Sequence, residues 1–232
     1  MVGGGADLRP LTGAQRGVWM AQTLAPESAR FHTADAIELR GPVEVDRLAH
    51  AIRTVLDGAE ALHARFLDTA DGPRQALRPE RDWPLERVDL RAESDPAAAA
   101  DARMARDLRT PIDLATDRLF HAALLRTGDD TWTWYLRIHH IATDAYATAL
   151  LIRRVADRYT AAVTGADEPP LALSPLESLL AVDAAYDGGD DHAADRAFWS
   201  ERLAGHATPP TLGGAGGGGE PARAAIRVRD DA

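Results

Sequence analysis

Two adjacent histidines, His139 and His140, and an aspartate four residues after the second, Asp144, stand out as side chains that could do chemistry. Imidazole titrates near neutral pH without help from its surroundings, so one histidine could accept a proton or position a reacting group. The three residues could instead bind zinc, although no further ligand is evident and the chain has no cysteine. A third interpretation is purely structural, with the histidines as hydrogen-bonded polar groups at the end of a strand.

The flanking residues predict which elements hold these side chains. Upstream, hydrophobic residues alternate along one face with the period of a half-buried strand: Trp132, Trp134, Leu136 and Ile138. Downstream, they recur at helical spacing: Ala147, Leu151, Val155 and Tyr159. The histidines are therefore predicted where a strand passes into a helix. Because adjacent strand residues point to opposite faces, we expect one histidine to face a cleft and the other to support the turn. Asp144 falls in the first helical turn, where it complements the helix dipole.

Four segments carry a resemblance to a known family. The segment His139–Ala145 resembles the HHxxxDG motif of the condensation domains of nonribosomal peptide synthetases, in the chloramphenicol acetyltransferase-like superfamily. Pro10–Trp19 is similar to the opening LTxAQxGxW motif, and Glu60–Phe66 to the end of the second motif, RHExLRxxF. Phe198–Ala204 resembles the yWxxxL helix that precedes the crossing to the second lobe. The motifs follow the family's order, from about Leu8 to the C-terminus.

The resemblance implies a chloramphenicol acetyltransferase-like α/β lobe and amide bond formation. The amine of a carrier-bound aminoacyl acceptor would attack the thioester of a carrier-bound acyl or peptidyl donor. By resemblance His140 is the active-site residue, His139 supports the turn, and Asp144 is structural and pairs with an arginine. No cofactor is expected to bind directly, because phosphopantetheine arms of partner carrier proteins hold the substrates. The implied partners are donor and acceptor carrier domains, the second lobe and adjacent synthetase domains.

Three positions depart from the family's pattern. The motif glycine is Ala145, which adds a methyl group close to the expected site. The arginine of the second motif is His63, and we expect a hydrogen bond from His63 to Asp144 to replace the ion pair. Arg65 is a second candidate partner, and another arginine-to-histidine change falls at His121. The alternatives are a catalytically inactive carrier-binding scaffold and a relative that forms esters or acylates a free small molecule.

Composition narrows the classes of function. The 232 residues, 45% of them hydrophobic, suffice for one domain with a sizeable core. The chain has neither cysteine nor lysine, which excludes thiolate, Schiff-base and P-loop lysine chemistry. A formal net charge of -10 argues against nucleic acid as a partner. No apolar run reaches the ~18–20 residues of a membrane span and no signal-peptide core is evident, so a cytoplasmic protein without membrane contact is expected.

Alternating helices and strands predict an α/β domain with a layered, mixed sheet. Strands are expected at 35–40, 62–67, 74–77, 119–126 and 131–138, and helices at 12–25, 45–56, 96–108, 144–165, 176–186 and 191–203. Residues 1–204 are interpreted as the N-terminal lobe, 205–221 as a Gly/Pro-rich linker, and 222–232 as the start of a truncated second lobe. In the family the second lobe closes a tunnel over the histidines, so these 232 residues alone are expected to be an incomplete enzyme.

Overall fold

The computed structural model describes residues 7–78 and 82–205. It divides into two compact units, residues 1–185 and 186–232, which we describe separately. Apart from Gly205, the linker predicted for 205–221 and the second-lobe start predicted for 222–232 lie outside the described residues. The boundary predicted after residue 204 therefore stays a prediction.

A four-stranded sheet forms the centre of the first unit, in the order β2-β7-β6-β5. The strands are β2 (His32–Arg40), β5 (Leu85–Asp89), β6 (Phe120–Gly128) and β7 (Thr131–His139). β5 and β6 are parallel, and the other two pairs are antiparallel. The mixed sheet predicted from the sequence is confirmed, as is the hairpin of β6 and β7.

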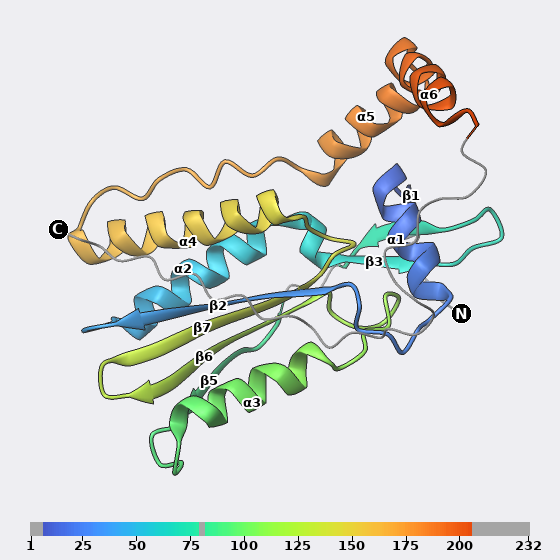
Figure 1. Ribbon diagram of the computed structural model, residues 1–232. Helices are drawn as coiled ribbons and strands as arrows, with labels where there is room; N and C mark the ends of the chain where they lie inside the picture. The colour runs from blue at the N-terminus through green and yellow to red at the C-terminus, as the bar shows by residue number, and fades with distance from the viewer. Residues whose placement is uncertain (1–6, 79–81, 206–232) are drawn as a thin grey trace. The chain divides into compact units, whose positions relative to one another are not determined.

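Two helices cover one face of this sheet: α2 (Val45–Gly58) and α4 (Ala145–Thr164) (Figure 1). They bury a hydrophobic stripe that includes Ile52, Val55 and Val155 against β6 and β7. α4 ends at Gly165, which takes the left-handed conformation that glycine adopts without steric cost. This packing fixes the start of α4 relative to the end of β7.

α3 (Pro96–Leu108) covers the opposite face of the sheet (Figure 1). Asp95 caps its first turn by accepting a hydrogen bond from the amide of Ala98, and Pro96 supplies a helical φ at the first position. Met104 packs on Leu125 in the layer between α3 and the sheet. The sheet is therefore covered on both faces.

A small three-stranded sheet, in the order β1-β4-β3, lies beside the end of β7 (Figure 1). Its strands are β1 (Arg9–Pro10), β3 (Ala64–Leu67) and β4 (Arg74–Leu77). The predicted hairpin is confirmed, but its first strand starts later than expected, because residues 60–63 form a short 3-10 helix, η1 (Glu60–His63). α1 (Gly13–Thr23) starts with a capping box between Thr12 and Gln15. Ile141 packs in the same core as β3, so the histidine turn contacts this sheet.

The last two helices are α5 (Leu176–Asp187) and α6 (Asp190–Leu203). α5 crosses the boundary between the two units, and α6 lies in the second. No residue of α6 is buried, and Phe198 and Trp199 are more than half exposed. No helix among the described residues is both long and apolar enough to cross a membrane.

Candidate active site

The two histidines lie at the turn between β7 and α4, as the sequence predicts. β7 ends at His139, whose backbone N–H donates to the carbonyl of Leu119 at 2.7 Å. The N–H of His140 donates to the carbonyl of Phe31 at 2.7 Å, which extends the pairing with the β2 side of the sheet by one step. α4 begins five residues later, at Ala145. The backbone of the turn is thus held from both neighbouring strands.

His139 is fully buried. Its Nδ1 accepts a hydrogen bond from the backbone N–H of Ile141 at 3.2 Å, so Nδ1 carries no proton. Burial, and then the nearby His32, His140 and Arg137, lower the pKa of His139 to about 3. His139 is therefore neutral at physiological pH, with its proton on Nε2, and it supports the turn.

His140 is exposed, on the opposite side of the strand from His139. Its Nδ1 lies 2.7 Å from the carbonyl oxygen of Thr143. A carbonyl can only accept a hydrogen bond, so the neutral ring must carry its proton on Nδ1 and a lone pair on Nε2. An imidazole fixed in this tautomer can accept a proton at Nε2, which is what a general base requires.

Asp144 caps the first turn of α4. Its Oδ1 accepts a hydrogen bond from the backbone N–H of Ala147 at 2.7 Å, and the side chain is exposed. The Thr148 hydroxyl reinforces the cap by donating to the backbone carbonyl of Asp144 at 2.9 Å. Asp144 therefore stabilises the start of the helix that follows the histidines.

The predicted hydrogen bond between His63 and Asp144 is wrong. His63 is buried, and its Nε2–H donates to the carbonyl of Leu56 at 3.0 Å, near the C-terminus of α2. Its ring also packs edge-on against Phe120, with centroids 5.6 Å apart. The 3-10 turn at 60–63 places the imidazole against α2, whereas Asp144 is exposed at α4. Across the described segments, no hydrogen bond or ion pair joins the two residues.

The sequence also singles out Arg65, Ala145 and His121. Among the described residues, none of these side chains bonds to His139 or His140. The Nε of Arg65, on β3, is buried without a hydrogen bond, and no ion pair with Asp144 forms among the described residues. Ala145 is the first residue of α4 and has a negative φ, so its methyl group causes no backbone strain. His121 faces the α3 side, with Nδ1 3.1 Å from Asp107 Oδ1.

Sequence reasoning missed two glutamines of α1 that contact this turn. Gln15 Nε2 donates to the carbonyl of Ile141 at 3.4 Å, and Gln22 Oε1 lies 3.5 Å from Nε2 of His139. Both glutamines are buried, and they lie seven positions apart, which places them on one face of a helix. That spacing is the signal that could have found them.

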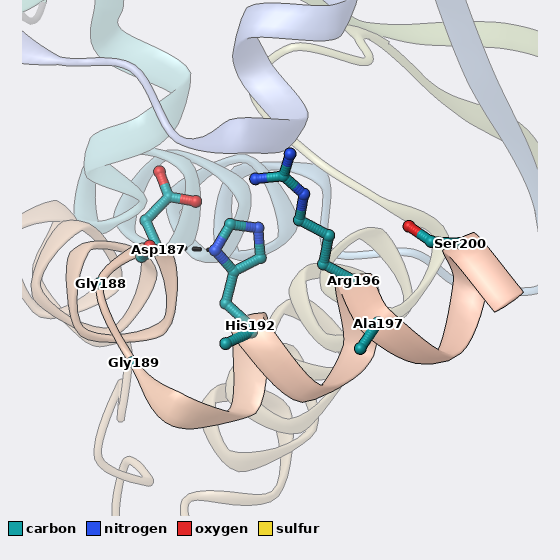
Figure 2. A pocket seen from close by; sticks show the side chains of 8 residues that line it. Asp187, Gly188, Gly189, His192, Arg196, Ala197 and Ser200 are labelled. Carbon is teal, nitrogen blue, oxygen red and sulfur yellow. Dashed lines mark hydrogen bonds between the residues drawn. The ribbon is translucent and has the colours of Figure 1, made fainter.

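Neither a metal site nor a cavity of the second unit coincides with the histidine turn. In residues 7–78 and 82–205, no three His, Asp or Glu side chains lie close enough together to hold a metal ion. A cavity of about 480 Å³ lies in the second unit, where Asp187, His192, Arg196 and Ser200 line it (Figure 2). There the His192 Nδ1–H donates to the carbonyl of Asp187 at 3.0 Å. None of the predicted site residues lines this cavity.

Comparison with known proteins identifies the family. The sequence model of the condensation domain matches residues 6–214. The chain is 41% identical over 194 residues to a dimodular nonribosomal peptide synthase of Bacillus subtilis, which covers 84% of this chain and 8% of that protein. It is 38% identical over 218 residues to an isonitrile lipopeptide synthase of Streptomyces coeruleorubidus, covering 94% of this chain and 15% of that one.

Solved structures agree with this assignment. An arginine-to-alanine mutant of the starter condensation domain of rhizomide synthetase RzmA, in complex with C8-CoA, matches with a TM-score of 0.83 and 35% identity, over 88% of this chain and 47% of that one. The first condensation domain of the calcium-dependent antibiotic synthetase matches with a TM-score of 0.79 and 33% identity, over 91% and 51%. The chain thus spans about half of each solved domain, and it belongs to the condensation domain family.

Proposed function

We propose that this chain is the N-terminal half of a condensation domain that forms amide bonds in nonribosomal peptide synthesis. The observation that carries the proposal is the exposed His140, whose Nδ1–H is committed to Thr143 and whose Nε2 is left with a lone pair. The family assignment supplies the reaction type, and the tautomer of His140 fits the role that the reaction needs.

The reaction joins an amine to a thioester. The acceptor's amine nitrogen attacks the donor's carbonyl carbon, the new C–N bond forms, and the C–S bond then breaks. An α-amine titrates near ~7.7–8.0, so an appreciable fraction is already neutral at physiological pH. His140 Nε2 therefore accepts the proton that the nitrogen loses as the tetrahedral intermediate forms, and that proton leaves with the thiolate. The same contact holds the nitrogen in line with the carbonyl.

The proposed reaction implies which kinds of partner the domain needs and where it works. Donor and acceptor carrier domains present the substrates on phosphopantetheine arms, and the domain itself binds no further cofactor. The second half of the domain and the neighbouring synthetase domains complete the enzyme, since the chain covers 8% and 15% of the two synthases compared above. A condensation domain works where its carriers are loaded, and for this protein we propose the cytoplasm.

The two departures near the motif do not favour an inactive scaffold. Ala145 occupies a helical position with a negative φ, where alanine is better accommodated than glycine. His63 bonds to the end of α2 and leaves the hydrogen bonds of His140 intact. Neither substitution removes a group that the proposed proton transfer uses, so the active enzyme is the better supported of the two functions.

The test uses the full-length protein. Its acceptor carrier is loaded with each proteinogenic amino acid in turn, and the donors are C8-CoA and carrier-bound acyl or aminoacyl thioesters. Product on the acceptor arm is followed by mass spectrometry. We expect His140→Ala to lower the rate by ~10²–10⁴-fold. The matched control is His50→Ala, an exposed histidine of α2, which should stay within about twofold of the natural protein.

Two outcomes would contradict the proposal in different ways. Product formation that does not depend on His140 would remove the catalytic assignment while leaving the family's reaction in place. Absence of product from the natural protein across the whole panel, with carrier binding retained, would favour the inactive scaffold. Product with a free small molecule or an alcohol as acceptor, but with no carrier-bound amine, would favour the third alternative.

A further inference from the structure

The inner face of α1 is unusual in what it buries. A helix that packs on a protein core normally buries hydrophobic side chains, yet the two buried residues of α1 are Gln15 and Gln22. Burying an amide is unfavourable unless its hydrogen bonds are satisfied inside the protein. The hydrogen bonds of these two amides therefore show which parts of the protein the buried glutamines hold in place.

Gln15 bonds at both ends of its amide. Its Oε1 accepts from the backbone N–H of Thr12 at 3.0 Å and from Nε2 of Gln75 at 2.7 Å. Its Nε2 donates to Oε1 of Gln75 at 3.3 Å and to the carbonyl of Ile141 at 3.4 Å. The N–H of Thr12 can only donate, so it fixes Oε1 on its own side of the amide, and Gln15 presents a donor to the residue that follows His140.

Gln22 is oriented by the loop after α1. Its Nε2 lies within 3.5 Å of three backbone carbonyls, those of Ala25, Pro26 and Ser28. Rotating the amide by half a turn would place an oxygen against three oxygens, so this environment admits only one orientation. Gln22 Oε1 consequently faces His139, 3.5 Å from Nε2, as an acceptor.

The two amides are the ends of one hydrogen-bonded chain, which we call the glutamine clamp. His139 Nε2–H donates to Gln22, and His139 Nδ1 accepts from the N–H of Ile141. The carbonyl of Ile141 then accepts from Gln15. The clamp therefore holds the residue before His140 and the residue after it, and its polarity requires the Nε2–H tautomer of His139. It leaves the ring of His140 free to act.

We infer that Gln22 is a positioning residue of the condensation reaction, which acts through His139 to hold the backbone on both sides of His140. The inference rests on the proposed function and adds to it a role for α1. Gln22 is buried and bonds to protein groups of the turn and of its own loop, so it acts on the rate of the chemical step and not on substrate affinity.

The test combines Gln22→Met with His140→Ala in the full-length protein, using the acceptor assay described above. Methionine keeps the length of glutamine and removes both its donor and its acceptor. We expect Gln22→Met to lower kcat by about 10-fold with KM for the loaded carriers unchanged. In the His140→Ala background the same substitution should change the residual rate by less than about twofold, because the clamp then has no histidine to position.

A loss of stability alone would not give this pattern. The matched control is Met104→Ala, which opens a cavity between α3 and the sheet and removes no hydrogen bond of the clamp. It should lower the unfolding midpoint and leave kcat within about twofold at a temperature well below that midpoint. Gln15→Met breaks the clamp at its other end and should show the same dependence on His140.

Four outcomes would overturn the role proposed for Gln22. Natural kcat in folded Gln22→Met would overturn the inference while leaving the proposed function standing, provided that His140→Ala is inactive. An equal loss with and without His140 would also overturn it, because the role would then be structural. Unfolding of both glutamine variants at the assay temperature would also overturn the inference, because the two glutamines would then serve stability alone. A natural protein that makes no product would remove the proposed function, and this inference with it.

Discussion

Two residues of the same type have opposite chemistry at the histidine turn because their side chains lie on opposite faces of one strand. His139 is buried and neutral, with both ring nitrogens bonded to protein groups. His140 is exposed, with Nδ1 bonded to the protein and Nε2 without a hydrogen bond to any described residue. The division of roles follows from the alternation of a strand and from the length of the turn, and not from any difference between the side chains.

The low pKa of His139 predicts how stability changes with pH. In the unfolded chain a histidine binds a proton near pH 6.5, whereas folded His139 does so only near pH 3. Between those values the unfolded state binds more protons, so stability falls as pH decreases through that range, by at most about 1.4 kcal/mol per pH unit. Above pH 6.5 this contribution is fully present.

Chemical denaturation at pH 7, 6, 5 and 4.5 measures this effect. His139→Asn carries no titrating group, so its free energy of unfolding should depend less steeply on pH than that of the natural protein. Staying above pH 4 keeps carboxylates such as Asp107 out of the comparison; the His121 hydrogen bond and the Arg137 charge outweigh burial there and lower the pKa of Asp107. Equal slopes for the two proteins would mean that His139 is not held neutral.

At the scale of elements, two helix ends are completed by residues that the family motifs single out. Asp144 caps the start of α4, and His63 bonds to a carbonyl near the end of α2. α2 has no basic residue in its last turn, so the imidazole N–H of η1 takes over part of that role. The motif residues therefore fix the two helices that pack together on one face of the sheet.

The cap at Asp144 predicts a difference between two substitutions. Asp144→Ala should lower the free energy of unfolding by about 1 kcal/mol, because the N–H of Ala147 loses its acceptor. Asp144→Asn keeps the acceptor oxygen and should stay within about 0.5 kcal/mol of the natural protein. Equal losses for the two, measured by urea denaturation, would instead indicate that the negative charge of Asp144 is paired.

The contact of His63 with α2 predicts a second loss of stability. His63→Ala removes the donor to Leu56 and the edge-on contact with Phe120, and we expect a cost of ~1–3 kcal/mol. Thermal and urea unfolding measure it, with the exposed His50→Ala as the control. If the pairing with Asp144 were correct after all, the double substitution of His63 and Asp144 would cost less than the sum of the single ones.

Elements set by neighbouring residues were predicted well from the sequence. The helix from Pro96, the β6–β7 hairpin and the helix that ends before Gly165 all depend on caps, turns and periodicity within a few positions. β5 was not predicted, because its pairing partner β6 lies more than thirty residues away and its own five residues carry little pattern.

In the candidate site, too, features set by neighbouring residues could be predicted and long-range contacts could not. The strand-to-helix turn and the different exposure of the two histidines could be predicted from residues 131–165. The hydrogen-bond partner of His63 and the contacts of the two α1 glutamines with the turn could not, because these contacts join residues brought together only by the folded chain. Resemblance to the family even suggested the wrong partner for His63, since an imidazole is shorter than the arginine it replaces.

At the scale of the whole molecule, the chain holds the candidate histidines on a folded unit but covers 47% of the solved starter domain that it resembles. Large hydrophobic side chains also remain exposed on the last two helices: Leu179, Val182, Phe198, Trp199 and Leu203. Enclosing a reaction excludes water and orients both substrates, which contributes much of the rate of such a site.

The isolated 232 residues are therefore expected to make less than about 1% of the product that the full-length protein makes under the same conditions. Both proteins are given identical loaded carriers, and circular dichroism first establishes that the isolated chain is folded. Comparable turnover by the two would show that the histidine turn suffices without the rest of the domain.

The pairing of β7 with β2 has a consequence for how the protein folds. His32 lies opposite His139 and Arg40 opposite Thr131, so every contact in this ladder joins residues roughly a hundred positions apart. Such contacts form slowly, because a long loop must close before the pairing can stabilise it. During synthesis on the ribosome, the amide of His140 cannot reach the carbonyl of Phe31 until β7 has emerged. The histidine turn should accordingly be among the last parts of the first unit to assemble, and a ribosome that pauses before residue 140 would hold β2 without its partner strand.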